Sequence, residues 1–230
     1  IAPLEPTNVK DAAIVTLSET GMLTYCTPGA QPESVLLEVP VYGWSAITDM
    51  DVEGDLLLIV DTGTGTRAVW SYYGQGQDFT DAEARLFFPN DPEVDLENTV
   101  GIDVFSDTMV FLGHDNTVTT CLVQTLDAEF RECLELPPRD SQEMTLVFKN
   151  LKWIDFYPTF YPPAFYLMDG TTKTLYRFSY KMIINKAYRF MPLEGEELPQ
   201  GEITAFTVTD SQLIIVAYGN EIYLGQLKVE

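Results

Sequence analysis

Four aspartates recur at positions where they could act together as acids and bases. Asp51, Asp103 and Asp155 each directly precede the apolar residue that ends a short hydrophobic run, and Asp49 adds a fourth carboxylate close to Asp51. Glycoside hydrolases use two carboxylates, one as the acid and the other as nucleophile or base. The pattern therefore raises the hypothesis of a glycosidase with these carboxylates at its centre.

The regular recurrence of these aspartates favours a structural role over a catalytic one. A catalytic pair needs two different environments to separate its pKa values. A residue that recurs once per repeat unit is more typically a hydrogen-bond partner for the backbone of the next unit. We therefore predict a non-enzymatic protein without catalytic residues, and keep the glycosidase as the alternative.

Two further motifs give only weak signals for catalysis. The TGTGTR segment, residues 62–67, leads into a strand-like run and not into the helix that a phosphate-binding loop requires, so we expect a hairpin turn. His114 is the only histidine of the chain, which excludes a multi-histidine metal site. We expect His114 in a surface turn and assign no cofactor.

An acidic loop offers one weak metal site. Asp91, Glu93, Asp95 and Glu97 alternate along DPEVDLEN, and calcium takes about six to eight oxygen ligands. The loop lacks the central glycine of helix–loop–helix calcium sites. We therefore expect an acidic connection between two units, with calcium as a minor alternative.

These candidate residues belong to an internal repeat. Val52, Val104, Phe156 and Val208 end the first short run of successive units and follow one another at equal intervals of 52 residues. Each unit contains a short strand, a longer apolar strand, a tight turn and a third strand, and most units add a fourth. Four antiparallel strands that repeat every 40 to 50 residues or so indicate a β-propeller.

The predicted fold is therefore all-β, with about five four-stranded blades in a single domain over residues 1–230. The repeat units span approximately residues 10–43, 44–97, 98–149, 150–200 and 201–230. We expect the first and last blades to be incomplete, because IAPLEP is a poor inner strand and the last unit ends after its third strand. We therefore expect a longer protein in which a preceding segment closes a ring of five or six blades.

The blade cores resemble those of a known group of propellers. GIDVFSDTMVFLGHDNTV (101–118) and ITDMDVEGDLLLIVD (47–61) are similar to the repeats of six-bladed propeller proteins of the NHL and TolB-like kind. Those families serve mostly as binding platforms, often as extracellular domains of longer proteins. The resemblance covers nearly the whole chain and implies a protein-binding or ligand-binding module of a larger surface or sensor protein, whose chemistry has to be argued from a site.

Two of the three cysteines are spaced for a cross-strand disulfide. A hairpin centred near Asp127 places Cys121 opposite Cys133, at a separation compatible with the bond. Such a bond implies an oxidising compartment, so we expect an extracytoplasmic protein that is periplasmic, secreted or on the cell surface. Cys26 is left over, either buried and inert or paired with a preceding segment.

Charge is distributed unevenly along this acidic chain, whose formal net charge is −22. Such a surface repels nucleic acid and anionic membranes, so we expect neither as a partner. Residues 149–190 form a basic island, which is either a solvated face or a docking surface for an acidic partner, including a second copy. Its basic residues are Lys149, Lys152, Lys173, Arg177, Lys181, Lys186 and Arg189.

The fourth unit also contains an unusual aromatic and proline-rich insertion, YPTFYPPAFY. Binding sites favour loops on rigid scaffolds, and tyrosine is enriched in interface hot spots. The alternative is that these rings fill a widened gap between blades. The predicted binding site combines the insertion with nearby basic side chains: Tyr157, Phe160, Tyr161, Lys152, Lys173 and Arg177.

Overall fold

The computed structural model describes most of the chain, and every regular element in the described ranges is a β-strand. The described residues are 2–3, 14–27, 29–63, 67–88, 94–124, 129–148, 151–157, 164–192, 195, 197–209, 213–219 and 221–227.

The strands form five separate antiparallel sheets, which are the blades. Blade 1 contains β1 (Ala2–Pro3), β2 (Ile14–Leu17), β3 (Met22–Cys26) and β4 (Glu33–Leu36). Blade 2 contains β5 (Ile47–Glu53), β6 (Leu56–Asp61), β7 (Ala68–Tyr73) and β8 (Arg85–Leu86). Blade 3 contains β9 (Thr99–Phe105), β10 (Thr108–Gly113), β11 (Val118–Gln124) and β12 (Glu129–Leu136). Blade 4 contains β13 (Leu151–Tyr157), β14 (Ala164–Asp169), β15 (Thr174–Ser179) and β16 (Ile184–Arg189), and blade 5 contains β17 (Ile203–Val208), β18 (Leu213–Tyr218) and β19 (Glu221–Gln226).

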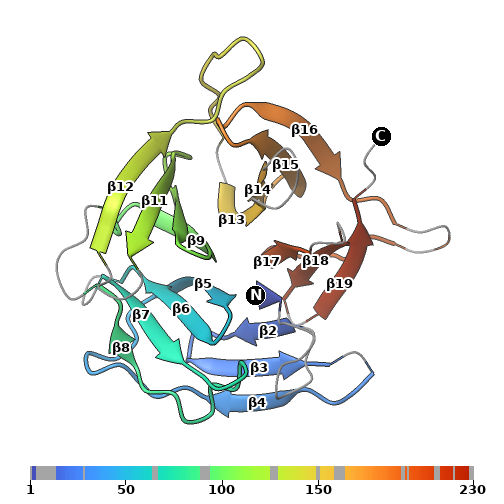
Figure 1. The fold of residues 1–230 in the computed structure, drawn as a ribbon. Coiled ribbons are helices and arrows are strands. Elements are labelled where there is room, and N and C mark those ends of the chain that lie inside the picture. The colour runs from blue at the N-terminus through green and yellow to red at the C-terminus, as the bar shows by residue number, and fades with distance from the viewer. Residues whose placement is uncertain are drawn as a thin grey trace.

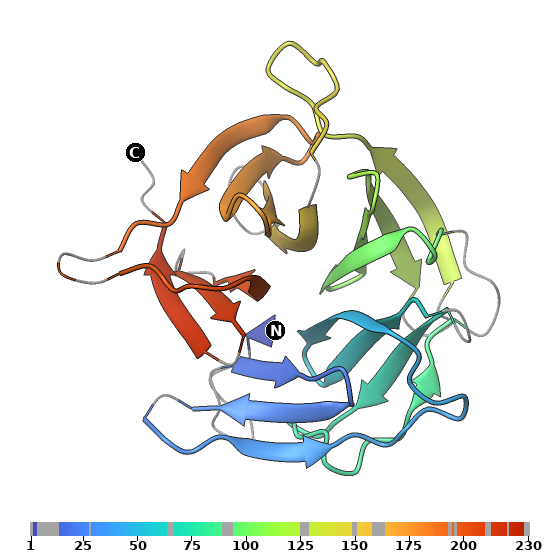
Figure 2. The same cartoon turned by 180° about the vertical axis from the view of Figure 1, so that it is seen from behind.

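The five blades are arranged around a central axis, as the views from the two sides show (Figure 1, Figure 2). The first strand of each blade lies innermost, and each inner strand contacts the inner strand of the next blade. The ring closes because β1 contacts both β5 and β17. The prediction of an all-β propeller with five blades is confirmed.

The innermost strand of blade 1 corrects one expectation. The proline-rich start of the chain was expected to leave this position empty, but β1 fills it and pairs with β2 through Ala2–Val15 and Pro3–Ile14. Two extended residues suffice because the φ angle that proline imposes is compatible with an extended chain at the end of a ladder. Blade 5 has three strands within the described residues, as expected.

The blades pack face to face through apolar side chains on both sides of their second strands. All six residues of β14 are buried, as are five of the six in β6. Such strands read as continuous apolar runs because each sheet is covered on both faces. Buried clusters join blade 1 to blade 2, blade 2 to blade 3, blade 3 to blade 4 and blade 4 to blade 5.

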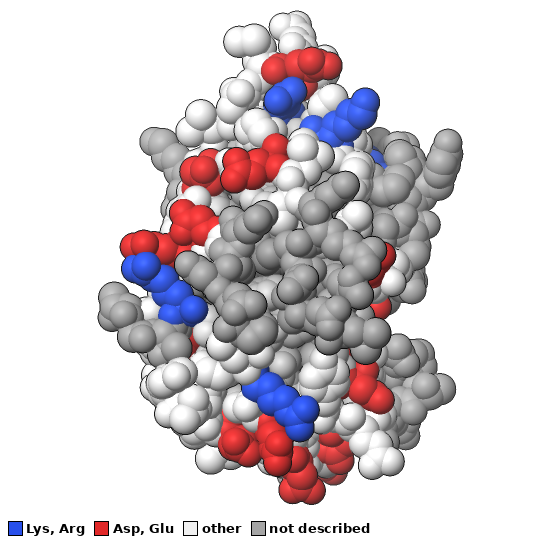
Figure 3. All heavy atoms as spheres, turned by 60° about the vertical axis from the view of Figure 1, so that its left-hand side comes forward, with Lys and Arg blue, Asp and Glu red and all other residues white. Residues whose placement is uncertain are grey.

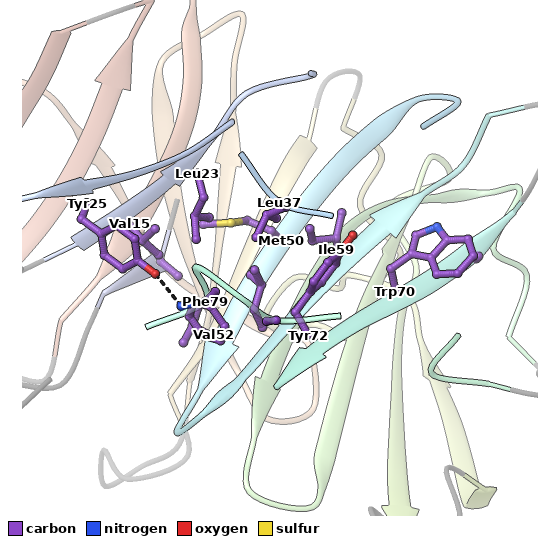
Figure 4. Close-up of a cluster of buried hydrophobic side chains, with 14 residues drawn as sticks. Val15, Leu23, Tyr25, Leu37, Met50, Val52, Ile59, Trp70, Tyr72 and Phe79 are labelled. Atoms are coloured by element: carbon purple, nitrogen blue, oxygen red, sulfur yellow. Dashed lines mark hydrogen bonds between the residues drawn. The ribbon is translucent and has the colours of Figure 1, made fainter. Parts of the chain in front are cut away.

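The cluster between blades 1 and 2 shows how polar groups are accommodated in these interfaces (Figure 4). The hydroxyl of Tyr25 donates to the carbonyl of Gln77 at 3.1 Å and accepts the backbone N–H of Phe79 at 2.9 Å. Tyr72 donates its hydroxyl proton to the carbonyl of Glu38 at 2.8 Å. Both tyrosines can therefore bury their rings without leaving a hydroxyl unsatisfied.

Cys121 and Cys133 form a disulfide, as predicted from a hairpin that places the two cysteines opposite each other. They lie directly opposite each other on β11 and β12, with 4.2 Å between their Cα atoms. Cys121 is buried and Cys133 is exposed. Cys26 is a half-buried free thiol on β3, and burial raises its pKa.

We predict that reducing this disulfide lowers the free energy of unfolding by about 2–3 kcal/mol, because the bond closes a short loop in the unfolded chain. Urea unfolding with and without reductant measures the change. The Cys26→Ser variant is the control, since it keeps the disulfide and should lose the same amount on reduction. An unfolding midpoint that reductant leaves unchanged would contradict the prediction.

Candidate functional site

The carboxylates of blade 2 lie at the axis, where they accept hydrogen bonds from blade 3. Asp49 Oδ2 accepts the backbone N–H of Ile102 at 3.0 Å, and Asp51 Oδ2 accepts that of Val104 at 2.8 Å. These side chains project from β5 toward β9, the inner strand of the following blade. The two carboxylates thus accept hydrogen bonds from backbone N–H groups of β9 that are not paired within the sheet of blade 3.

The same bond recurs between blades 4 and 5. Asp155 on β13 accepts the backbone N–H of Val208 on β17, and it accepts the hydroxyl of Thr207 at 2.9 Å. Asp155 therefore occupies the same place in its blade as Asp51 does in blade 2. A structural role for these repeated carboxyls was the interpretation that their spacing favoured.

The axial carboxyls also bond to one another. Hydrogen bonding to the side chain of Asp103 lowers the pKa of Asp51 and of Asp155, against the larger opposite effect of burial. A carboxylate can only accept a hydrogen bond, so each carboxyl–carboxyl contact requires a proton on one of the two groups. Asp51, Asp103 and Asp155 thus place a series of interacting carboxyls from three successive inner strands at the axis.

Burial sets the protonation of this group. Asp103 and Asp155 are each 8% exposed, while Asp49 and Asp51 are partly exposed. Burial raises the pKa of Asp49 and of Asp155 from the usual 3.8 to about 7, against the opposing effect of the hydrogen bonds that they accept. Burial also raises the pKa of Asp51. The site can therefore hold protons near neutral pH.

Close packing at the axis leaves little space beside these carboxyls. A Cβ at Gly101 would lie 3.3 Å from Asp49 Oδ2 and 3.3 Å from the carbonyl oxygen of Lys152. Glycine at this position therefore lets β9 approach its two neighbouring inner strands. The carboxyls are held between packed strands by backbone amides, and this environment suits a structural proton-sharing cluster.

The binding site predicted in blade 4 is divided by the strand register. Lys152 lies near the start of β13, and Lys173 directly precedes β15 at the same end of the blade. Tyr157 ends β13 at the opposite end, paired with Ala164, and Arg177 lies between the two ends. Phe160, Tyr161 and the side chain of Tyr157 lie outside what the structure describes, so this composite site stays a prediction.

The basic residues of blade 4 have contacts of their own. Lys173 Nζ donates to the carbonyl of Pro199 at 3.3 Å and lies 5.1 Å from the ring centre of Tyr218 on β18. It therefore links blade 4 to blade 5. Arg177 is half-buried and lies opposite Lys186 on β16. Lys152 is exposed.

The acidic loop has only part of its residues in the described structure. Asp95 Oδ1 accepts the backbone N–H groups of Glu97 and Asn98, and Glu97 forms an ion pair with Arg67 at 2.7 Å. Asp91 and Glu93 lie outside the described ranges. Where side chains are described, no cluster of three or more His, Cys, Asp or Glu residues could hold a metal ion.

Two other predicted turns are observed. His114 is exposed in the turn between β10 and β11, where its N–H donates to the carbonyl of Asn98 at 2.7 Å. The TGTGTR segment connects the antiparallel strands β6 and β7, although residues 64–66 are not described. Neither segment is the start of a helix.

An exposed apolar edge was not singled out from the sequence. Along β19, Ile222 and Tyr223 are each 39% exposed and Leu224 is 71% exposed. Within the described residues, β19 is the outermost strand of blade 5.

Acidic side chains outnumber basic ones on one described side of the ring (Figure 3). Figure 3, in which the side of the ring that carries blades 2 and 3 comes forward, shows scattered groups of acidic side chains with fewer basic ones. None of the described elements is a helix that could cross a membrane.

Comparison with protein-family models and with curated proteins finds no match. Among solved structures, the chain is similar to a glutaminyl cyclase from Myxococcus xanthus, with a TM-score of 0.54 and 10% identity over 90% of this chain and 88% of that one. It is also similar to a gluconolactonase from Xanthomonas campestris, with a TM-score of 0.54 and 10% identity over 95% of this chain and 69% of that one. Both are β-propeller proteins, and at this identity the likeness shows the fold alone. The NHL and TolB-like resemblance stays a prediction.

The raised pKa values predict that this protein loses stability as the pH rises. The folded-state pKa of Asp155, about 7, lies above its usual 3.8, so the folded state binds more protons than the unfolded state. This stabilisation is complete below about pH 4 and disappears as the pH passes about 7. We expect the free energy of unfolding to fall by about 1–3 kcal/mol per such group between pH 5 and pH 8.

Urea unfolding of Asp155→Asn across this pH range tests the cause. Asparagine stays neutral and its oxygen can still accept the N–H of Val208, so the pH dependence should flatten. Glu19→Gln, at an exposed position on a turn, removes one charge in the same way and should keep the wild-type slope. Equal slopes in all three proteins would show that general charge repulsion, and not the axial cluster, causes the pH dependence.

Proposed function

We propose that this chain is a non-enzymatic interaction module whose propeller is a rigid platform for a protein partner or ligand. One observation carries this proposal. Asp51 and Asp155, at equivalent positions in blades 2 and 4, each accept a backbone N–H from the inner strand of the following blade. Carboxyls that hold neighbouring blades together are not available to attack or protonate a substrate.

Exposed features at the outside of the ring support a binding role. Blade 4 supplies basic side chains on an otherwise acidic protein, which suits an acidic partner or a second copy. Blade 5 supplies an exposed strand edge with apolar side chains. Association through such surfaces leaves the packed axis undisturbed.

The disulfide supports a location of this module in an oxidising compartment. Cys121 and Cys133 are joined in the folded chain, and such bonds persist in oxidising compartments. We infer that the module works outside the cytoplasm, as part of a larger surface or sensor protein.

A propeller hydrolase is the second candidate. Asp49 and Asp155 have pKa values of about 7, and a carboxyl that carries a proton near neutral pH can act as a general acid. The similar solved structures also include enzymes. In a glycosidase, the carboxyls of the axial series would have to serve as an acid and a base of unlike environment.

Hydrolysis assays with Asp103→Asn separate the two candidates. Asp103 bonds to both neighbouring carboxyls, so its loss would disable any catalysis that uses the series. We expect wild type and Asp103→Asn to release no more aryl alcohol from aryl glycosides of either anomeric configuration, at pH 5 and pH 7, than buffer does. Hydrolysis by the wild type that falls by ~100-fold or more in a folded Asp103→Asn variant would establish the hydrolase instead.

A further inference from the structure

A hairpin between blades 3 and 4 projects from the rim of the ring. It spans residues 138–147, in the connection from β12 to β13, and it is the yellow loop that extends beyond the blades in both views (Figure 1, Figure 2). The chain is described without a break from residue 129 to residue 148, and again over β13. The hairpin is therefore an internal feature of the fold.

Backbone hydrogen bonds hold the first arm of this hairpin against blade 4. Arg139 donates its N–H to the carbonyl of Met182 at 2.7 Å, and its own carbonyl accepts the N–H of Ile184 at 2.8 Å. Ile184 is the first residue of β16, so the arm pairs in parallel with the start of the fourth strand of the blade. This pairing fixes the hairpin on the blade.

The turn at the tip of the hairpin is also held by hydrogen bonds. Asp140 Oδ1 accepts the N–H groups of Gln142 and Met144 at 2.8 and 2.9 Å, and the carbonyl of Asp140 accepts the N–H of Glu143 at 3.0 Å. Glu143 has a φ of 62°, which lets the chain reverse into the second arm. A hairpin ordered in this way loses little conformational freedom when it binds.

The second arm has backbone groups without a partner in the described chain. The N–H of Leu146 and the carbonyl of Met144 bond to the first arm, at 2.8 and 2.9 Å. Successive residues of an antiparallel arm point their backbone groups to opposite sides. The N–H and C=O of Thr145 therefore point away from the hairpin, and the same alternation directs those of Val147 outward. This arm is a free strand edge at the rim.

Exposed apolar side chains accompany this edge. Met144 is 63% exposed and Val147 is 85% exposed, whereas the ring of Phe148 packs 4.8 Å from that of Tyr176 at the base of the arm. The segment 144–148 reads MTLVF, which contains no charge and no proline and includes residues that favour strands. An uncharged, exposed edge of this kind is a place where a further strand adds.

The edge is complementary to itself in antiparallel orientation. When two copies pair around Leu146, the two Leu146 side chains meet across the axis. Thr145 of each copy then lies opposite Val147 of the other, and the outward backbone groups of these two residues can bond to each other. In the same register, Met144 lies opposite Phe148. Every cross-strand pair is thus formed by side chains that suit neighbouring strands.

Charge at the ends of the segment favours a second copy as the occupant. With its flanking residues the segment reads EMTLVFK, so it begins with Glu143 and is followed by a lysine. Antiparallel pairing around Leu146 sets the acidic end of each copy against the basic end of the other. The net charge of −22 opposes association over longer distances, and added salt screens that repulsion.

We propose that two copies of this chain associate through this edge, with residues 144–148 of each paired antiparallel around a two-fold axis at Leu146. This inference rests on the proposed interaction function and names a second copy as a partner. The contact uses the same surface on both copies, so it closes at a dimer. One pair of short strands buries little surface, and we expect a weak dimer that forms as the concentration rises.

Sedimentation equilibrium of the purified chain tests the proposal. We expect the average mass to rise from monomer toward dimer between about 10 μM and about 1 mM, the range of weak association. About 0.5 M salt is present to screen the repulsion between the acidic chains. Hydrogen exchange at the amides of Thr145 and Val147 should slow over the same range. The amide of Arg139 bonds to Met182 within one copy and should exchange at a constant rate.

Two proline variants of the same hairpin locate the contact. Thr145→Pro removes the outward N–H without removing a hydrogen bond of the hairpin, and should weaken association by about tenfold or more because each dimer loses two backbone bonds. Ser141→Pro is the control. It lies at the second position of the turn from Asp140 to Glu143, where proline is favoured, and should leave association unchanged.

A second pair of variants avoids any change to the backbone. Val147→Lys places a charge opposite Thr145 of the other copy and should weaken association by about threefold or more. Val41→Lys makes the same substitution at another valine that is 85% exposed, in the connection from blade 1 to blade 2, and should have no effect. Both side chains are in solvent, so both variants are expected to fold.

The inference is overturned by a chain that stays monomeric over the whole range, or by equal association of the variants within each pair. An exchange rate at Thr145 that does not change with concentration would also overturn it, since the edge would then be free or covered by the chain itself. Hydrolysis of aryl glycosides is measured on the same samples. A monomer without hydrolysis therefore removes this inference alone, while hydrolysis removes the interaction function.

Discussion

The hydrogen bonds that inner-strand carboxyls accept from the next blade are the interaction on which the ring depends. Inner strands converge at the axis, where each has backbone amides that its own sheet leaves unpaired. A buried N–H without an acceptor costs about 1–3 kcal/mol. Asp51 and Asp155 supply acceptors from one blade to the next, and burial in turn raises their pKa values, an effect that the side chain of Asp103 opposes.

The recurring carboxyl position is not acidic in blade 5. At the repeat position of Asp51 and Asp155, blade 5 carries Thr207, whose hydroxyl donates to Asp155. No axial carboxyl is therefore present at this position to bond from blade 5 to β1. Among the described strands, the inner strands β17 and β1 bring the last and first blades into contact, while Leu36 and Leu224 farther from the axis are exposed.

The repeat made much of this structure predictable. Equal spacing of Val52, Val104, Phe156 and Val208 predicted blades 2 to 5, and the length of one hairpin predicted the disulfide. The two-residue strand β1 was not predicted, because strand patterns need several residues and Pro3 argued against one. The separation of Lys152 from Tyr157 also escaped prediction, because proximity in sequence does not show that a strand carries the two to opposite ends of a blade.

The protonation state of the axial aspartates tests this account most directly. Carbon-13 NMR of the side-chain carboxyl carbons follows each aspartate through a pH titration, with assignment by single Asp→Asn variants. The account predicts that Asp49 and Asp155 titrate near pH 7, well above the exposed aspartates of the same chain. Titration of all four axial aspartates near pH 4, with the exposed ones, would contradict it, because the carboxyls would then be solvated and not buried between the blades.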